Sequence, residues 1–581
     1  MNQKVKEQPK RKEVDTAVSP SFVKPLFLGE IHEDLVLPYP RPEYLERQRI
    51  NELIEAAWRF TDEHYDPRQA EAYGWVGDDI IAGLGERGLL GLYISPKYGG
   101  QGLSQTGYGL VFEEIGCIDP TLSVVLGVHQ SIGMKGIHMF GSEAQKDRFL
   151  PDLAAGRKLA AFALTEPNAG SDAYHIQSRA IPQRDGSYRL FGEKRYIGNG
   201  SKDVLTVFAR TDEGAHVALI VEKGMEGLEV GRSYPTMGLK ANDLRHLKFN
   251  DVRVPPENVL GEEGDGFKIA VEVLNNGRLS LGAGSIGSVK KLLRLAVNHT
   301  LEREQFGRPL AEFGLVEDKI GWTASYLYGL QSMAYLNTGL VDAGMPDYSL
   351  ESAIVKVAGT EFLWYAANRM FQLAGGEAYI TDQPYEKILR DIRVFPIFEG
   401  ANDVLRVFIA LSGLKPLANE LSDLQEVDFS QPIRSLGVLA DYVENRIRRE
   451  IQPDRLNEVH ADLKPLADPV TDQVKRLRHV SEKLLRQHGE DVQEEQRQLK
   501  RLAHAVIDIY AQVATISRVS DVLERDLIAT PAEERYIAET FCARAARRVQ
   551  RCLDQIEDND DERMHRIARA AYVRRGYEHS I

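Results

Sequence analysis

The sequence predicts a multidomain protein in which helical domains flank a single β domain, and three observations lead to this fold class. Apolar residues recur at spacings of three and four from about residue 43 to 153, which is typical of amphipathic helices. From about residue 159 the pattern changes to short apolar runs bounded by Gly, Asp and Asn, as expected for strands. Helical periodicity returns near residue 266, and 581 residues suffice for several separate cores.

These changes of pattern divide the chain into an N-terminal arm, a helical domain, a β domain, a helical bundle and an extra helical domain, at residues 1–40, 41–158, 159–262, 263–415 and 416–581. We expect the β domain to be antiparallel, because runs such as DVLTVFART and HVALIVEKG are separated by turns and not by helices of useful length. After Pro416 the polar stretch ANELSDLQEVDFSQP predicts a linker.

Composition narrows the class of protein. The formal charge of −14 argues against a general nucleic-acid surface. Three cysteines without a CxxC, and no His/Cys cluster at ligand spacing, predict neither a disulfide framework nor a metal site. No uncharged apolar run reaches the roughly 18–20 residues of an integral membrane span. The N-terminal sequence resembles neither a secretory signal nor a transit peptide, so we expect a cytoplasmic enzyme.

One glycine-rich motif allows two readings. Gly282, Gly284 and Gly287 fit GxGxxG, and Glu302 falls where a Rossmann fold would carry its ribose-binding acid. The flanking sequences are helix-like and not strand-like, which disfavours a dinucleotide site. We therefore expect these small residues to allow close packing between helices.

Three further segments could carry chemistry. The stretch TEPNAGSD follows a strand-like run and offers hydroxyl and backbone N–H groups to a polar ring or phosphate, although a surface turn is the simpler explanation. The stretch EREQFGRP places Arg303 and Arg308 beside Phe306 near a helix end. In FPIFEGAND, Glu399 follows four apolar residues, and a carboxylate there is either paired or functional, because burial without a partner raises its pKa.

Taken in order, the motifs LTEPNAGSDA, GEKRYIGNG, REQFGRPL, QLAGGEAY and IFEGANDVLR closely resemble the acyl-CoA dehydrogenase family. HQSIGMKG, LNNGR and the helical C-terminal extension resemble, more narrowly, its very-long-chain branch. The resemblance runs from about Ser21 to about Leu414 and weakens beyond. It implies the family fold of an N-terminal helical domain, a middle antiparallel β domain and a C-terminal four-helix domain, here with an extra helical domain.

The resemblance implies FAD-dependent oxidation of a long-chain fatty acyl-CoA to the trans-2-enoyl-CoA, a step of fatty acid β-oxidation, with electron-transfer flavoprotein as acceptor. Glu399 matches the family's base, which removes the α-proton while flavin N5 accepts the β-hydride. Some relatives carry the base at the position of Gly277, and its lack of a carboxylate here favours Glu399. We expect Phe395, Ile397 and Phe398 to form an apolar wall beside that base.

Positional matching also implies the binding residues. Those expected to contact FAD are Phe162, Leu164, Thr165, Gly170, Ser171, Tyr196, Gly198, Arg303, Gln305, Phe306, Gln372, Gly376, Ala401 and Asp403. Those expected on the substrate side are Ser171, Asn275, Arg278, Gly400, Gly133 and Gly136. The positions that match a contact with FAD across a subunit interface, and so imply at least a homodimer, are Arg303, Gln305, Gln372 and Gly376.

Three departures from the family pattern bear on the cofactor. Tyr196 stands where the family usually has Trp. Gly198 replaces a Thr or Ser whose hydroxyl group hydrogen-bonds the flavin near N5, and Ala401 replaces a common Thr. Because each missing hydrogen bond is worth about 0.5–1.5 kcal/mol, we expect a flavoprotein with altered redox tuning.

Gly133 and Gly136 lie three residues apart in the helix-like stretch VVLGVHQSIGMKGIHMF. A glycine inside a helix costs about 1 kcal/mol relative to alanine, so the pair needs an explanation. Close helix packing explains it as well as the hypothesis implied by the long-chain branch, in which the absent side chains deepen the acyl tunnel.

Two other functions stay open at this point. One is an acyl-CoA oxidase, whose reduced flavin reacts with oxygen. The other is an assembly or binding paralogue of low activity, which the hydroxyl groups lost at Gly198 and Ala401 favour and Glu399 opposes. The interspersed charges of the C-terminal block favour a solvated, dimer-stabilising helix bundle rather than a membrane anchor. Peripheral contact with a membrane stays open.

Overall fold

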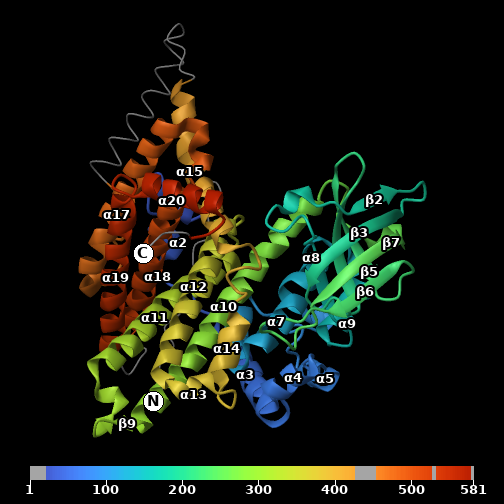
Figure 1. Cartoon of the computed structure of the whole chain (residues 1–581), viewed down its shortest axis with the longest axis horizontal. Helices are drawn as coiled ribbons and strands as arrows, with labels where there is room; N and C mark the ends of the chain where they lie inside the picture. The colour runs from blue at the N-terminus through green and yellow to red at the C-terminus, as the bar shows by residue number, and fades with distance from the viewer. Residues whose placement is uncertain (1–20, 426–452, 526–530, 578–581) are drawn as a thin grey trace. The chain divides into compact units, whose positions relative to one another are not determined.

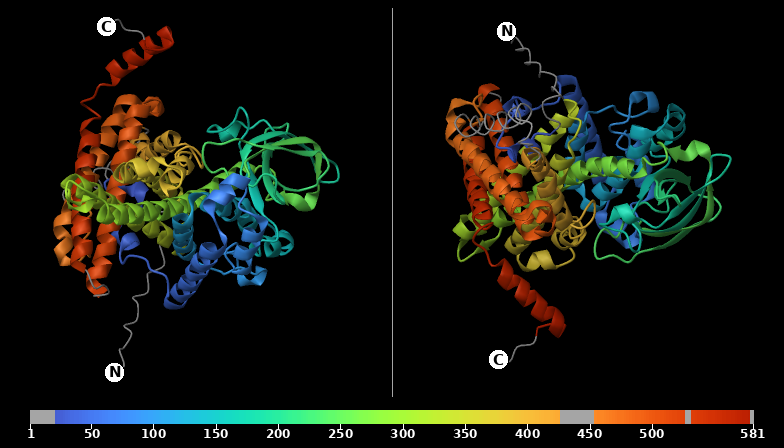
Figure 2. Two further views of the ribbon diagram at one scale, coloured as in Figure 1. Left: turned by 60° about the horizontal axis from the view of Figure 1, so that its bottom comes forward. Right: turned by 90° about the horizontal axis from the view of Figure 1, so that it is seen from above.

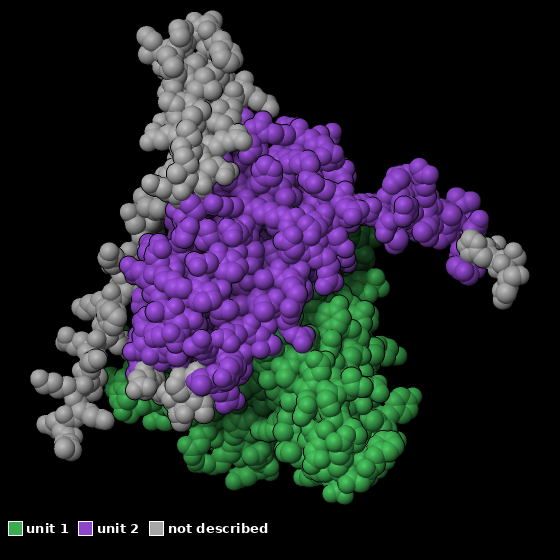
Figure 3. Space-filling view, turned by 90° about the vertical axis from the view of Figure 1, so that its left-hand side faces the viewer, with its two compact units in different colours: residues 1–20, 39–402 green, residues 21–38, 403–581 purple. Residues whose placement is uncertain are grey.

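The computed structural model describes residues 21–425, 453–525 and 531–577. The chain packs as two compact units, coloured separately in Figure 3. The first unit contains residues 39–402, and the second contains residues 21–38 together with the described residues from Asp403 onward. Within these ranges no helix combines the length and the apolarity needed to cross a membrane.

The first unit begins with a helical region. Its helices are α3 (Tyr44–His64), α4 (Pro67–Tyr73), α5 (Asp78–Glu86), η1 (Pro96–Tyr98), α6 (Gln105–Ile118), α7 (Pro120–Gly127), the π-helix η2 (Val128–Gly133), α8 (Lys135–Phe140) and α9 (Glu143–Ala154). Asp119 caps α7 by accepting a hydrogen bond from the Leu122 N–H at 3.1 Å, and Pro120 occupies the first helical position. The start of α7 is therefore fixed by local sequence.

The π-helix η2 joins α7 to α8 and is tied to the β domain. Its i→i+5 pattern includes the Met134 N–H bonded to the His129 carbonyl oxygen at 3.0 Å. Buried His129 accepts from the Ala160 N–H at 3.0 Å, and its second ring nitrogen lies 3.0 Å from the Leu153 carbonyl oxygen. Burial lowers the pKa of His129 to about 4, so the neutral ring bridges η2, α9 and the first strand.

The β domain contains β1 (Ala160–Ala163), β2 (Arg179–Pro182), β3 (Tyr188–Ile197), β4 (Val204–Arg210), β5 (His216–Glu222), β6 (Leu228–Ser233), β7 (Arg245–Val254) and β8 (Val259–Leu260), with the short helices η3 (Ala173–His175) and η4 (Pro256–Asn258). The strand order is β6-β7-β3-β2-β4-β5-β8, and β1 also pairs with β4. The sheet curls strongly on itself (Figure 2).

The sheet is mixed where we expected antiparallel pairing throughout. β1 runs parallel to β4 over Ala160–Ala163, and β2 meets the far end of the same β4 edge, also in parallel, at Arg210. β4 and β5 are buried along nearly their whole length, because helices of the first unit cover them, α10 among these. Strands of this kind show continuous apolar runs whatever their direction, so the sequence did not distinguish the two pairings.

A buried ion pair fixes the loop that follows β1. Lys194 on β3 is fully buried, and its Nζ lies 2.7 Å from Glu166 Oε1 and 3.0 Å from the Leu164 carbonyl oxygen. Glu166 also accepts hydrogen bonds from the Gln177 and Ser178 N–H groups. Glu166, the first acidic residue of TEPNAGSD, therefore anchors that loop to β3 and does not face a ligand.

The rest of the first unit is a helical bundle of α10 (Gly266–Glu302), α11 (Gly314–Asp342), α12 (Ser349–Ala374), α13 (Gly376–Tyr379) and α14 (Pro384–Ile392), with the hairpin β9 (Glu304–Gln305) and β10 (Arg308–Pro309) and the turn η5 (Leu310–Glu312) between α10 and α11. The glycine-rich motif lies inside α10 (Figure 1). A Cβ atom at Gly282 would come within 2.5 Å of Val355 on α12, and one at Gly287 would overlap the Glu113 carbonyl oxygen on α6. The prediction of close helix packing is confirmed.

The second unit combines the short helices α1 (Val23–Leu26) and α2 (Glu33–Val36) with α15 (Asn402–Gln425), η6 (Ala461–Leu463), α17 (Lys464–His488), η7 (Gly489–Glu494), α18 (Gln496–Arg525), α19 (Pro531–Asp554) and α20 (Asp561–Arg574). Phe22 packs its ring against Tyr510, and the Ile31 N–H donates to Asp454 Oδ2 at 3.2 Å. The linker expected after Pro416 begins as helix, since α15 continues to Gln425, and its remainder lies outside the described residues. The order helical, β, helical and extra helical is confirmed.

We expect Glu166→Ala to lower the free energy of unfolding by about 3–5 kcal/mol, because it leaves the buried Lys194 ammonium group without its carboxylate. Urea unfolding followed by circular dichroism measures this change. Glu226→Ala, which removes an exposed carboxylate of the same domain, is the control. Equal unfolding midpoints for the two variants would contradict the prediction.

Candidate active site

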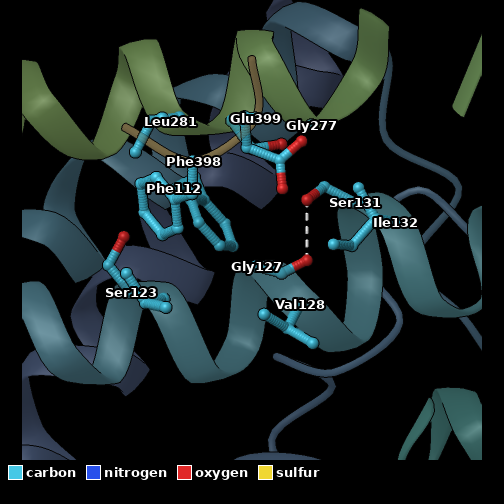
Figure 4. Close-up of a pocket in the computed structure, with 12 residues that line it drawn as sticks. Phe112, Ser123, Gly127, Val128, Ser131, Ile132, Gly277, Leu281, Phe398 and Glu399 are labelled. Atoms are coloured by element: carbon cyan, nitrogen blue, oxygen red, sulfur yellow. Dashed lines mark hydrogen bonds between the residues drawn. The ribbon is translucent and has the colours of Figure 1, made fainter. Parts of the chain in front are cut away.

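A pocket of about 340 Å³ lies inside the first unit, between α10 on one side and α7 with η2 on the other (Figure 4). It is lined by Phe112, Ser123, Val124, Gly127, Val128, Ser131, Ile132, Gly277, Ser280, Leu281, Phe398 and Glu399. Glu399 is the single acidic or basic residue in this lining. The pocket is therefore an apolar cavity with one carboxyl group in its wall.

Glu399 reaches the pocket from a tight turn between α14 and α15. Its backbone is left-handed, with φ of 56°, and Gly400 follows with φ of 94°. The turn is closed by the Asn402 N–H, which donates to the Pro396 carbonyl oxygen at 3.0 Å. A left-handed glutamate is strained, so the surrounding contacts must hold it in place.

Two buried basic residues hold this turn. Arg278 Nε donates to the Glu399 carbonyl oxygen at 3.2 Å, and its Nη1 donates to Asn275 Oδ1 at 2.8 Å. Lys356 Nζ donates to the Gly400 carbonyl oxygen at 2.7 Å and to Asn402 Oδ1 at 2.8 Å. The predicted residues Asn275 and Arg278 thus meet Glu399 as supports of its backbone.

The Glu399 carboxyl group is directed into the pocket, toward Ser131 and Ile132 (Figure 4). Its Oε2 atom is buried and has no hydrogen-bond partner among the residues that the structure describes. Loss of hydration raises the pKa of Glu399 to about 7, against the opposing charges of Arg278 and Lys356. This carboxyl group therefore changes its charge near neutral pH.

Gly277 explains how the carboxyl group fits. A Cβ atom at this position would lie 2.7 Å from Glu399 Oε2 and 2.8 Å from Ile132 Cγ2. The missing side chain on α10 is therefore the space that the Glu399 carboxyl group occupies. Of the apolar residues expected beside it, Phe398 lines the pocket and Phe395 stacks on Phe398 at 5.5 Å. The third, Ile397, does not contribute to this apolar wall, because it is 55 % exposed.

Gly133 and Gly136 do not line this pocket, and their surroundings favour close packing, the other explanation given for them. A Cβ atom at Gly133 would lie 2.7 Å from the Ala160 backbone, and one at Gly136 would lie 3.3 Å from Leu260. Both glycines serve close packing against the β domain. Gly127 is the glycine that opens the pocket, since a Cβ there would lie 3.5 Å from the Phe112 ring, at ordinary contact distance.

The residues expected near the flavin ring lie together at the edge of the β domain. The Arg195 N–H donates to the Thr165 carbonyl oxygen at 2.8 Å, which joins the loop after β1 to the end of β3. Tyr196 has φ of 58° and leaves 55 % of its side chain exposed, and a Cβ at Gly170 would meet nothing within 4 Å. An exposed ring beside open backbone fits a flat cofactor with polar edges.

This edge approaches the pocket at Gly198, and His129 ties β1 to η2, which lines the pocket. A Cβ at Gly198 would lie 3.1 Å from Val128 Cγ2, and Val128 lines the pocket. Phe162 and Leu164 are largely buried on β1 and just after it, while Ser171 is exposed. The ring-facing positions and Glu399 therefore belong to one connected region.

A second group of expected FAD positions lies elsewhere. Arg303 closes α10, the hairpin behind it exposes 94 % of Phe306, and Gln305 is exposed beside it. The end of α12 carries Gln372, and α13, which begins at Gly376, meets α10 where Glu377 Oε2 lies 3.5 Å from His299 Nδ1. None of these residues lines the pocket.

Two expected positions after the Glu399 turn fall outside the pocket lining. Ala401 is half-buried beside Gly400. Asp403 belongs to the second unit, where its exposed side chain pairs with Arg406 at 2.8 Å.

Sequence reasoning did not identify Lys356, nor the pocket residues Phe112, Val128 and Ser131. For Lys356 a signal existed, because a lone lysine inside the apolar helix stretch SAIVKVAG predicts a buried, hydrogen-bonded amine. Val128 and Ser131 carried no such signal, because their direction depends on the wide turn of η2.

The fold and the pocket together fit one class of protein, the flavin-dependent dehydrogenases that enclose a substrate between helical domains and a β domain. Family models match the chain as acyl-CoA dehydrogenase N-terminal, middle and C-terminal domains at residues 48–157, 161–252 and 264–414, and as the ACAD9/ACADV C-terminal domain at 461–577.

Whole-chain comparisons agree with these matches. The mitochondrial very long-chain specific acyl-CoA dehydrogenase of Rattus norvegicus is 37% identical over 94% of this chain and 86% of its own. The probable acyl-CoA dehydrogenase FadE10 of Mycobacterium tuberculosis is 32% identical over 94% and 88%. An acyl-CoA dehydrogenase of Bacillus anthracis, solved with FAD, superposes with a TM-score of 0.80 at 28% identity and covers 92% of this chain and 91% of that one.

The chain belongs to the acyl-CoA dehydrogenase family. It is an acyl-CoA dehydrogenase, an oxidoreductase that acts on fatty acyl-CoA, and its cofactor is FAD.

We expect the Glu399 carboxyl group to titrate with a midpoint of about 7, because burial stabilises its neutral form. Infrared difference spectra should show a protonated-carboxyl band that is present at about pH 6 and lost above about pH 8, where an ordinary glutamate is ionised throughout. The band should be absent from Glu399→Gln. If the protonated Glu399 band is already lost at about pH 5, as for an ordinary glutamate, the prediction is wrong.

Proposed function

We propose that Glu399 removes the α-proton of a long-chain fatty acyl-CoA, which yields the trans-2-enoyl-CoA. The observation that carries this proposal is the unsolvated carboxyl group that alone supplies acid–base chemistry to the pocket. A carboxylate with a pKa of about 7 is a stronger base than a hydrated one, and it is about half ionised at pH 7 and largely ionised above that. FAD, when bound, supplies the oxidant by accepting the β-hydrogen as hydride.

The turn that carries Glu399 also offers a donor to the thioester oxygen. The Glu399 backbone N–H makes no hydrogen bond within the described part of the chain. Arg278 fixes the carbonyl oxygen of Glu399, and Lys356 fixes that of Gly400. The backbone that follows this N–H is therefore held in place, so the N–H keeps its direction. A preorganised donor at that point stabilises the negative charge that develops on the thioester oxygen as the proton leaves.

The acyl chain lies, in this proposal, between α10 and α7. Phe112, Leu281 and Phe398 make that part of the pocket apolar, and Gly127 leaves its floor open. Apolar walls favour a hydrocarbon chain and exclude water from the carboxylate. A larger side chain at position 127 would therefore shorten the space that the acyl chain can fill.

We also propose that the active species is at least a homodimer. Arg303 is 26 residues beyond Gly277 on α10, which separates them by about 39 Å along a helix. This distance exceeds the length of an extended FAD whose ring lies beside Glu399. Arg303 and Gln305 can therefore contact FAD only in a second copy of the chain. Electron-transfer flavoprotein as acceptor and a cytoplasmic location stay predictions from the sequence.

Anaerobic titration of the FAD-loaded protein with palmitoyl-CoA tests the role of Glu399. We expect the flavin absorbance of the wild type to bleach, and the bleaching rate of Glu399→Gln to fall at least about 10³-fold, since a general base alone contributes roughly 10²–10⁴-fold. FAD content should stay unchanged. Glu312→Gln, at an exposed site of the same unit, is the control. Wild-type bleaching rates in Glu399→Gln would remove Glu399 from the reaction.

Substitution at Gly127 tests the position of the acyl chain. We expect Gly127→Leu to lower kcat/KM for a C16 substrate at least about tenfold relative to a C6 substrate, because the added side chain fills the floor beside Phe112. Gly321→Leu, where a Cβ meets nothing within 4 Å, controls for glycine replacement in a helix. A parallel loss for all chain lengths would place the acyl chain elsewhere.

A further inference from the structure

Asn242 is a buried polar residue without a partner. Its side chain is 8 % exposed, and its Oδ1 atom accepts no hydrogen bond within the described ranges. A buried polar atom left unpaired destabilises a folded protein by about 1–3 kcal/mol, so the Asn242 Oδ1 atom calls for a ligand that pairs with it.

The Asn242 amide lies next to Gly198, on the side where a Cβ atom would project. A Cβ at Gly198 would be 3.4 Å from Asn242 Oδ1 and 3.5 Å from Asn242 Nδ2. The same Cβ would be 3.1 Å from Val128, which lines the pocket that holds Glu399. The amide therefore occupies the space that a side chain at position 198 would take.

The backbone around Asn242 is held rigidly. Leu239 is left-handed, with φ of 51°, and its N–H donates to the buried Asp391 carboxylate at 2.7 Å. The Asn242 N–H donates to the Leu239 carbonyl oxygen at 2.9 Å, and the Asn242 carbonyl oxygen accepts from the Leu244 N–H at 2.8 Å. Both sides of Asn242 are thus fixed before any ligand binds.

Asp243 links this loop to the turn that carries Gly198. Its carbonyl oxygen accepts from the Gly200 N–H at 3.2 Å, and its Oδ2 accepts from the Ser201 N–H at 2.8 Å. These hydrogen bonds join the two segments, so the fold sets the distance between the Asn242 amide and Gly198.

We propose that the Asn242 carboxamide hydrogen-bonds the flavin ring at the edge that Gly198 leaves without a hydroxyl group. The proposal rests on the placement of the ring beside Gly198 and Glu399 given above. A carboxamide suits that edge because it offers a donor to a ring nitrogen of the oxidised flavin and an acceptor to an N–H of the reduced flavin. Asn242 is thus a positioning and tuning residue for the cofactor.

The test uses Asn242→Ala in the full-length protein, with three readouts. We expect the Kd for FAD to rise about 2–12-fold, the equivalent of one hydrogen bond. The flavin midpoint potential and the visible absorption bands should shift. The unfolding midpoint of the apoprotein should stay equal or rise, because the variant removes an unpaired buried amide.

A second substitution separates cofactor contact from packing. Gly198→Ser alone should not strengthen FAD binding, because Val128 and the Asn242 amide crowd its Cβ. In the Asn242→Ala background the amide no longer crowds this Cβ and Val128 is its remaining close neighbour, so Gly198→Ser should restore the Kd and the potential toward the wild-type values. Such a non-additive pair is the signature of two groups that serve one site.

Asn250→Ala, on the exposed side of β7, is the matched control and should change none of these values. The proposal is overturned if Asn242→Ala leaves Kd, potential and spectrum unchanged, or if its only effect is a less stable apoprotein. Bleaching of wild-type flavin by palmitoyl-CoA is measured in the same preparations. Intact bleaching with no effect of Asn242→Ala would reject this proposal while leaving the proposed function in place.

Discussion

The burial of one carboxyl group against a glycine on α10 is the constraint on which the proposed active site depends. Glu399 fits because α10 has a glycine at Gly277, and within the described residues its Oε2 atom is buried without a hydrogen-bond partner. Such a group is unfavourable in a folded protein unless its surroundings hold it. Arg278 and Lys356 do so through the backbone, which leaves the carboxylate oxygens available for chemistry.

Close approach of helices makes this wall possible. The small residues of α10 bring it against α6 and α12, while the π-helix η2 turns Val128 and Ser131 toward the same cavity. A wider helical turn in a pocket wall is a frequent feature of functional sites. The pocket is therefore a product of packing between elements, and its one charge lies on a separate turn.

Buried polar contacts join the helices to the β domain. The neutral ring of His129 ties η2 to β1, the Lys194–Glu166 pair fixes the loop after β1, and Asp243 ties the Asn242 loop to the turn at Gly198. The Asn242 Oδ1 atom is among the buried polar atoms left without a partner in the described residues. It lies beside the position where this chain lacks the family's hydroxyl group.

The sequence by itself determined the order of domains, the family and the candidate base, because helical periodicity, turn residues and the ordered motifs are local properties of the chain. It also identified the glycine-rich stretch of α10 as a packing motif. Tertiary structure alone decided that Gly127 lines the pocket, since a Cβ there would face Phe112, whereas one at Gly133 would meet the Ala160 backbone and one at Gly136 the Leu260 side chain. It alone decided the parallel pairings of β4, the continuation of α15 beyond Pro416, the partners of Lys356 and the place of Asn242 beside Gly198. The physical reason is that these depend on which residues distant in sequence come within a few ångströms of each other, a property of packing that no local pattern encodes.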